Sequence, residues 1–274
     1  MTSNKTILFF GGGNMARAII SGLIEAKYPN NNITVIDRNQ DKCIFFTNTF
    51  QINTATKLSP ALPFHDIVIL AVKPQNAKEA CAQLRLWLKH KTPLMLSLMA
   101  GMKLSALNTL LGTLSIVRAM PNLPALIKLG CTGLFANTQT TNDEKSEIEI
   151  LMSSIGITAW LENEEQMNVI TALSGSGPAY FFYLIEQMKI AAIQFGIPTD
   201  IAERFSLQTS YGASALAIEN NEPINELRKR VTSKKGTTEA ALNIFEANDF
   251  HKIIKNAMNA AIIRAEELSL QLEK

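Results

Sequence analysis

Near its start the chain carries the apolar run Thr6-Ile7-Leu8-Phe9-Phe10, which passes directly into Gly11-Gly12-Gly13-Asn14-Met15-Ala16. After this turn, apolar residues recur at intervals of three and four positions, a spacing typical of one face of a helix. Strand, glycine turn and helix in this order match the G-x-G-x-x-A fingerprint in the context that it requires. The stretch predicts the first strand and helix of a dinucleotide-binding α/β fold.

The small residues of the turn each have a place in that fingerprint. Gly11 permits the tight turn, Gly13 leaves room for a pyrophosphate, and Ala16 allows the helix to pack closely on the strand. Asn14 and Met15 begin the helix, whose free N–H groups and positive dipole end attract phosphates. We expect Gly11, Gly13, Asn14 and Met15 to bind the cofactor. The alternative is a glycine-rich turn that binds nothing.

Strand-length apolar runs and helical patterns alternate through residue 162. The further runs are Ile33–Asp37, Ile67–Val72, Leu94–Leu98, Ser115–Ala119, Thr132–Phe135 and Thr158–Leu161. Several of them are apolar without alternation, as strands covered on both faces should be. This order predicts the α/β class, with a Rossmann-type, doubly wound parallel sheet over residues 1–162.

The carboxyl ends of two expected strands carry further candidates for the cofactor site. Asp37 lies about 20 residues beyond the glycine turn, where a carboxylate holds the ribose hydroxyls of NAD. Arg38 is adjacent and would suit the 2′-phosphate of NADP, so the choice between NADPH and NADH stays open. Ala71, Val72, Lys73 and Pro74 close another strand at the edge that faces the ligand crevice.

Residues 163–274 have a different pattern. Glu162–Gln166 is a polar seam, and helical patterns follow at Pro178–Phe195, Thr199–Leu216, Thr237–Phe245 and His251–Leu272. The second and the last of these helices are apolar around much of their circumference. An all-helical C-terminal domain of this kind fits a dimerisation interface, or else packing against the first domain.

Composition excludes several classes of protein. The chain is 47% hydrophobic and 18% charged with a net charge of +2, so it is no disordered chain and has no overall charge that favours nucleic acid or an anionic membrane. No apolar run reaches the roughly 18 residues of a membrane-spanning helix. Cys43, Cys81 and Cys131 lie far apart, which predicts neither disulfides nor a metal site and suits a cytoplasmic protein.

The residues available for proton transfer argue against the reduction of a ketone. His65, His90 and His251 are all expected at the surface, and no lysine directly follows Gly175-Ser176-Gly177-Pro178, where a hydroxyacid reductase would carry one. A protonated imine needs less help, because its carbon is already electrophilic and the protein has mainly to position it.

The segment Val231-Thr232-Ser233-Lys234-Lys235-Gly236-Thr237-Thr238 fits such positioning. It leads into a predicted helix, so Thr237 or Thr238 would cap that helix and the loop N–H groups would face outward to a carboxylate. Taken alone, the segment also fits a capped helix after a solvated basic loop.

Five motifs in order give a more specific result. They are residues 11–16 (GGGNMA), 71–75 (AVKPQ), 118–125 (RAMPNLPA), 173–180 (LSGSGPAY) and 236–242 (GTTEAAL). Along nearly its whole length the chain resembles the pyrroline-5-carboxylate reductases. The resemblance implies hydride transfer from NADPH or NADH to the imine carbon of 1-pyrroline-5-carboxylate, giving L-proline, the last step of proline synthesis. It also implies a helical domain that interlocks with a second copy, as a homodimer or as a decamer built from dimers.

The resemblance also implies roles for individual residues. Gly236, Thr237 and Thr238 should bind the substrate carboxylate through their N–H groups, with the Thr238 hydroxyl near the ring nitrogen as the catalytic group. Further expected site residues are Ser176 and Gly177 in the substrate pocket, Met120, Pro121 and Asn122 beside the nicotinamide, and Asn53 near the adenosine ribose.

Two departures from the family pattern leave other functions open. Lys234-Lys235 stands where the family usually has Pro-Gly, and Arg228-Lys229-Arg230 replaces a stretch that commonly contains an aspartate. Loss of the glycine matters because glycine alone adopts positive φ freely. The alternatives are a related imine or hydroxyacid reductase with another substrate, and a non-catalytic NADP-sensing protein.

Overall fold

The computed structural model describes residues 5–89 and 91–273, and His90 lies outside this part of the chain. The chain forms two compact units. Unit 1 runs to Ser176 and includes the chain from Ala261 onward, whereas unit 2 comprises Gly177–Ala260. The boundary expected after residue 162 follows the change from strands to helices rather than these units, and it stays a prediction.

Unit 1 is built on an eight-stranded sheet with the order β3-β2-β1-β4-β5-β6-β7-β8. The strands are β1 (Ile7–Phe10), β2 (Ile33–Ile36), β3 (Asn53–Ala55), β4 (Ile67–Leu70), β5 (Leu94–Ser97), β6 (Ile116–Met120), β7 (Gly130–Ala136) and β8 (Gly156–Trp160). Strands β1 to β6 pair in parallel, so the doubly wound sheet is confirmed. β7 reverses this direction by pairing antiparallel with β6, and β8 pairs in parallel with β7.

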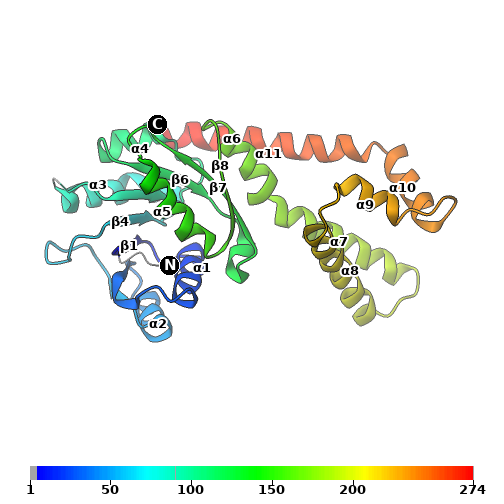
Figure 1. Ribbon diagram of the computed structural model, residues 1–274, viewed down its shortest axis with the longest axis horizontal. Coiled ribbons are helices and arrows are strands. Elements are labelled where there is room, and N and C mark those ends of the chain that lie inside the picture. Colours follow the sequence, from blue (N-terminus) through cyan, green and yellow to red (C-terminus); the bar gives the residue numbers. More distant parts are fainter. Residues whose placement is uncertain (1–4, 90, 274) are drawn as a thin grey trace. The chain divides into compact units, whose positions relative to one another are not determined.

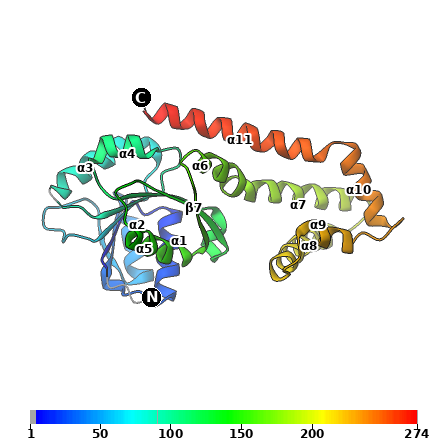
Figure 2. The ribbon, with the colours of Figure 1, turned by 45° about the horizontal axis from the view of Figure 1, so that its top comes forward.

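Helices cover both faces of the sheet (Figures 1 and 2). One face carries α1 (Asn14–Glu25), α2 (Gln40–Phe50) and α5 (Asn142–Ser153), and the other carries α3 (Ala77–Leu88) and α4 (Leu104–Leu111). In β1, Ile7 and Phe9 join the first core cluster while Leu8 and Phe10 join the second. Burial on both sides explains the unbroken apolar runs, since each such side chain contributes about 1.5–3 kcal/mol when buried.

Shorter elements connect the strands and helices of unit 1. They are the 3₁₀ turns η1 (Asn30–Asn32), η2 (Pro74–Asn76) and η3 (Leu123–Ile127), the short helix α6 (Gln166–Ile170) and the π-helical turn η4 (Thr171–Gly175). Side-chain capping sets where α2 and α5 start. At α5, Thr141 and Glu144 form a reciprocal capping box, which satisfies two otherwise free N–H groups.

Unit 2 is helical, as expected. It contains α7 (Gly177–Gln194), α8 (Thr199–Glu219), α9 (Ile224–Arg230), α10 (Thr237–Ala247) and the first part of α11 (Phe250–Glu273). Helix α9 was not expected, because its last turn reads as a basic loop. It is stabilised by Glu226 in its first turn and by Arg228, Lys229 and Arg230 in its last, where each charge complements the helix dipole.

The helices of unit 2 expose an unusual amount of apolar surface. Along α8, Phe205 is 67% exposed, and Leu207 and Tyr211 are also exposed. On α7, Phe181, Phe182, Tyr183, Leu184 and Met188 are exposed as well. A monomeric protein rarely exposes this many large apolar side chains on two neighbouring helices. The pattern therefore indicates that another surface covers these helices. Among the described residues, no helix combines the length and the apolar character needed to cross a lipid bilayer.

Candidate active site

The glycine turn joins β1 to α1 where the sheet changes its winding direction, between β1 and β4. Gly11 has a φ of +110°, and a Cβ built there would lie 2.6 Å from the carbonyl oxygen of Ala71. A Cβ on Gly13 would meet only that same oxygen, at 3.9 Å. Gly11 is therefore required by the fold. Gly13, the N-cap residue of α1, leaves open space there and has no side chain that could cap the helix.

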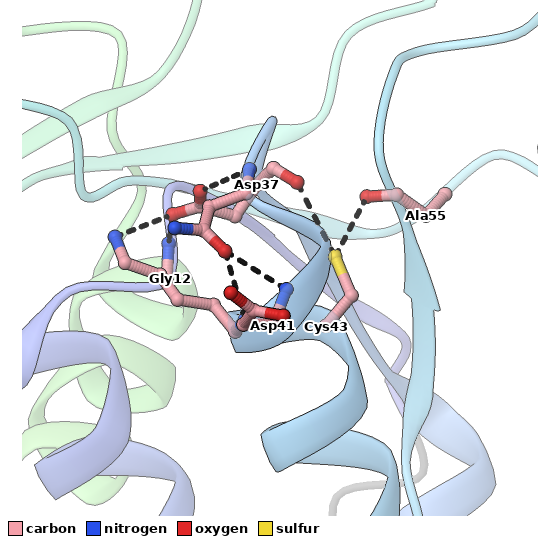
Figure 3. A network of polar contacts seen from close by, with 7 residues as sticks. Gly12, Asp37, Asp41, Cys43 and Ala55 are labelled. Carbon is pink, nitrogen blue, oxygen red and sulfur yellow. Dashed lines mark hydrogen bonds and ion pairs between the residues drawn. The ribbon is translucent and has the colours of Figure 1, made fainter.

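The carboxylate of Asp37 fastens this turn to the start of α2 (Figure 3). Its Oδ2 accepts hydrogen bonds from the Gly12 N–H at 2.8 Å and from Lys42 Nζ at 3.0 Å, and its Oδ1 accepts from the Asn39 N–H at 2.9 Å. Asn39 in turn caps α2. The Cys43 thiol lies on the other side, 3.2 Å from the Asp37 carbonyl oxygen. The sequence does not predict this network, because Gly12 and Asp37 lie 25 residues apart.

These contacts stabilise the ionised carboxylate. Burial alone would raise the pKa of Asp37, but the N–H groups of Asn39 and Gly12, together with Lys42, hold its pKa below the ordinary value. Three of the roughly four acceptor positions of a carboxylate are thereby occupied. Arg38 beside it is exposed, and no partner among the described residues holds its guanidinium.

The end of β4 borders the same crevice. Ala71 and Val72 are half-buried against Gly11, and Lys73 is exposed just before the turn η2, which begins at Pro74. The structure therefore brings Ala71 and Val72 together with the glycine turn. Lys73 follows them at the carboxyl edge, as the sequence predicts.

The end of β6 meets the π-helical turn η4. Asn122 is only 8% exposed; its Nδ2 donates to the Ser174 carbonyl oxygen at 3.0 Å, and its Oδ1 accepts from the Cys131 N–H at 2.9 Å. A Cβ on Gly175 would lie 2.7 Å from Met120 Cε. Met120 and Asn122 thus lie beside the segment that ends at Ser176. Because its amide both donates and accepts a hydrogen bond here, Asn122 links the end of β6 to η4 and to β7.

Sequence analysis missed η4 and the cavity that it helps to line. The cavity has a volume of about 440 Å³, lies beyond the ends of β4 and β5, and is lined by residues that include Gln75, Lys78, Gly101, Asn168 and Thr171. The sequence signal that could have indicated this cavity is Gly101, a glycine shortly after β5, which has a φ of +76° in the structure. π-Helical turns are frequent at functional sites, and η4 borders both this cavity and the end of β6.

A partly buried ion pair supports the same corner and was also missed. Glu164 Oε1 accepts from Arg118 at 2.6 Å and from the Leu104 N–H at 2.7 Å. The contact joins β6, the start of α4 and the segment before α6. No local sequence pattern predicts this ion pair, since Arg118 and Glu164 lie far apart in the sequence.

Two expectations fail for a physical reason. Asn53 begins β3, pairs with Thr34 and donates its amide to the Asn31 carbonyl oxygen at 2.9 Å, which places it toward the amino end of the parallel sheet. The glycine turn lies at the carboxyl end, so the structure does not bring Asn53 to it. His65 is buried rather than at the surface, with Nε2 2.9 Å from Thr34 Oγ1, and burial lowers its pKa.

The loop before α10 presents a free helix start in unit 2. Gly236 is the N-cap and has no side chain to cap the helix, so neither Thr237 nor Thr238 occupies the capping position expected for it. The Gly236 N–H donates to the Ser233 carbonyl oxygen at 2.9 Å, so this donor is already engaged. Thr237 and Thr238 are exposed in the first turn, where N–H groups have no intrahelical acceptor.

Comparison with known proteins shows which families this chain is similar to. Residues 164–268 match the family described as pyrroline-5-carboxylate reductase dimerisation, and residues 6–101 match the family described as NADP oxidoreductase, coenzyme F420-dependent. The pyrroline-5-carboxylate reductase of Pseudomonas aeruginosa is 40% identical over 98% of this chain and 99% of its own length.

Solved structures give the same result. A pyrroline-5-carboxylate reductase from Coxiella burnetii matches with a TM-score of 0.93 and 39% identity, covering 97% of this chain and 99% of that chain. The Plasmodium falciparum pyrroline carboxylate reductase with NADP bound matches with a TM-score of 0.83 and 25% identity, over 97% of this chain and 98% of that one.

Fold and matches together define an oxidoreductase with a Rossmann-type N-terminal domain and a helical C-terminal domain. Within that class, the chain belongs to the pyrroline-5-carboxylate reductase family.

Proposed function

We propose that this protein reduces 1-pyrroline-5-carboxylate to L-proline with a hydride from NAD(P)H. The observation that carries the proposal is the uncapped start of α10 at Gly236-Thr237-Thr238, in a chain that aligns over its full length with pyrroline-5-carboxylate reductases. The substrate is an anionic cyclic imine. A helix start with free N–H donors and a positive dipole end suits its carboxylate.

The glycine turn suits the cofactor. Gly13 leaves open space beside the first N–H groups of α1, so a pyrophosphate would fit where a larger side chain would project. Gly11, Gly13, Asn14 and Met15 would hold the phosphates, and Ala71, Val72, Lys73 and Pro74 would border the nicotinamide half together with Met120 and Asn122. We leave Asn53 out of this site because it lies at the other end of its strand.

The region around Asp37 supports NADPH over NADH. The carboxylate is largely occupied by Gly12, Asn39 and Lys42, which leaves it little capacity for two ribose hydroxyls. Arg38 is exposed beside it and without a partner among the described residues. Its guanidinium is therefore available to a 2′-phosphate, which arginine recognises well.

In the reaction, the bound nicotinamide supplies the hydride to the imine carbon. The chain binds the carboxylate through the N–H groups of Thr237 and Thr238, with Gly236 as the N-cap that leaves room for it. The Thr238 hydroxyl would lie near the ring nitrogen, as a hydrogen-bonding partner or a proton donor. Ser176 and Gly177 would line the pocket. Because a protonated imine is already electrophilic, positioning accounts for much of the rate.

Exposed apolar residues on α7 and α8 support a homodimer formed through the helical domain. Phe181, Phe182 and Phe205 are each more than half exposed in the single chain, and the family match over residues 164–268 is to a dimerisation domain. A second copy would cover these side chains, as obligate dimers cover core-like surfaces. We further propose that dimers associate into a decamer, as the family resemblance implies.

A steady-state assay tests the proposal. The purified protein should oxidise NADPH in the presence of 1-pyrroline-5-carboxylate and form L-proline, with a lower KM for NADPH than for NADH. Negligible turnover despite cofactor binding would refute the proposed reaction. Turnover of another cyclic imine would then favour a related reductase, and no turnover at all a nucleotide-sensing protein.

A further inference from the structure

The four residues before α10 form a tight turn whose sequence does not suit its geometry. The Gly236 N–H donates to the Ser233 carbonyl oxygen at 2.9 Å and closes the turn. Lys235, its third residue, has a φ of +58°, whereas Lys234 does not have a positive φ. A positive φ at the third position alone is the pattern of a type II turn, which favours glycine there and proline before it. Lysine adopts this conformation only at a cost.

The carboxylate of Glu239, four residues after Lys235 in the chain, offsets this conformational cost. Glu239 Oε2 accepts a hydrogen bond from the Lys235 N–H at 2.6 Å. Glu239 is half-buried in the first turn of α10. In an ordinary capping box the acid at this position bonds to the N-cap N–H. Here Ser233 already accepts that N–H, and Glu239 takes the donor of the preceding residue.

The turn also fixes how α10 begins. A Cβ on Gly236 would lie 3.0 Å from the Ser233 carbonyl oxygen, so the chain folds back closely on itself. The backbone of Lys235 leads directly into Gly236, Thr237 and Thr238. Any rotation at Lys235 would therefore redirect the N–H groups that follow it.

We propose that Glu239 is a positioning residue for the substrate carboxylate. By holding the Lys235 N–H, it keeps a non-glycine residue in the left-handed conformation and so keeps the N–H groups of Thr237 and Thr238 in place. Glu239 does not itself touch the substrate. This inference rests on the proposed function, because it concerns the same carboxylate site.

Four variants test the coupling between the two residues. E239A should raise the KM for 1-pyrroline-5-carboxylate about tenfold, the factor that corresponds to the strain of one left-handed residue. The KM for NADPH and the melting temperature should change little. E239Q keeps an acceptor oxygen and should recover most of the affinity. K235G should leave KM nearly unchanged, since glycine adopts the turn without help.

The double variant K235G/E239A tests whether Glu239 acts by holding residue 235 in the left-handed conformation. With glycine at 235 the turn no longer needs its anchor, so removal of Glu239 should then raise KM by less than about twofold. An equal rise in both backgrounds would overturn the inference, as would a loss in E239A that falls on NADPH as well. If the unmodified protein shows no turnover of 1-pyrroline-5-carboxylate, it is the proposed function that fails, and the two failures are thereby distinguished.

Discussion

The Gly12 N–H donates to Asp37 Oδ2 at 2.8 Å, across 25 residues of sequence. This bond joins the glycine turn after β1 to the end of β2, so the two parts of the expected cofactor site form one rigid corner. Asp37 is therefore a structural support for the turn as well as a candidate ligand.

Asp37→Asn should destabilise the protein by about 1–2 kcal/mol at neutral pH, because an amide cannot accept all three hydrogen bonds. The folded-state pKa of Asp37 is lowered, so its contribution is present above the ordinary value of 3.8 and is lost as pH falls through the folded pKa. Urea unfolding at pH 7 and below pH 3.8 should show the difference from wild type shrinking in acid. Asp41→Asn, an exposed neighbour on α2, is the control and should have a smaller effect.

Gly11→Ala should destabilise unit 1 by roughly 3 kcal/mol, since a Cβ would lie 2.6 Å from the Ala71 oxygen at a φ of +110°. Gly112→Ala is a matched control: its φ is +88°, but a Cβ there meets no atom within 4 Å among the described residues. Thermal unfolding of both variants separates the clash from backbone strain. Equal losses of stability would show that close approach to Ala71 is unimportant.

Arg38→Ala should raise the KM for NADPH about tenfold and leave that for NADH within about twofold, because only NADPH carries the phosphate that the guanidinium would bind. Steady-state kinetics with each cofactor measures this. Arg85→Ala, an exposed arginine on α3 over the other face of the sheet, should change neither. An equal loss with both cofactors would contradict the NADPH assignment.

Thr238→Ala should lower kcat at least about tenfold, the effect of losing one hydrogen bond in the transition state, without changing the affinity for NADPH. Thr237→Ala is the internal control, since only the N–H of Thr237 is expected to bind substrate. Rates and fluorescence titration with NADPH check both. If both substitutions weakened turnover and cofactor affinity alike, Thr238 would be holding the helix start rather than acting on the substrate.

Phe205→Glu should weaken self-association about 100-fold or more, because a second copy would bury the new charge. Sedimentation or light scattering across a concentration series reports the change. Ile157→Glu provides the comparison: Ile157 is 72% exposed on the edge strand β8, outside the helical domain, and its substitution should leave the assembly intact. A dimer unaffected by Phe205→Glu would place the interface elsewhere.

Much of the fold follows from local patterns. β1, β2, β4 and β5 lie within the apolar runs that predict them, because a strand buried on both faces needs a continuous apolar stretch. The short strand β3 was missed, since Asn53-Thr54-Ala55 has no strand-like pattern and is a strand only through its pairing with β2. The reversed direction of β7 likewise depends on how the chain returns to the sheet.

The sequence by itself determined the glycine turn, its strand and its helix, because each consecutive residue there satisfies a local requirement of the backbone. It also located the loop before α10. Only the tertiary structure decided that Gly12 and Lys42 occupy Asp37, that Arg118 pairs with Glu164, and that Asn53 lies at the wrong end of its strand. Those contacts join groups distant in the chain, and their geometry is fixed by packing rather than by any neighbouring residue.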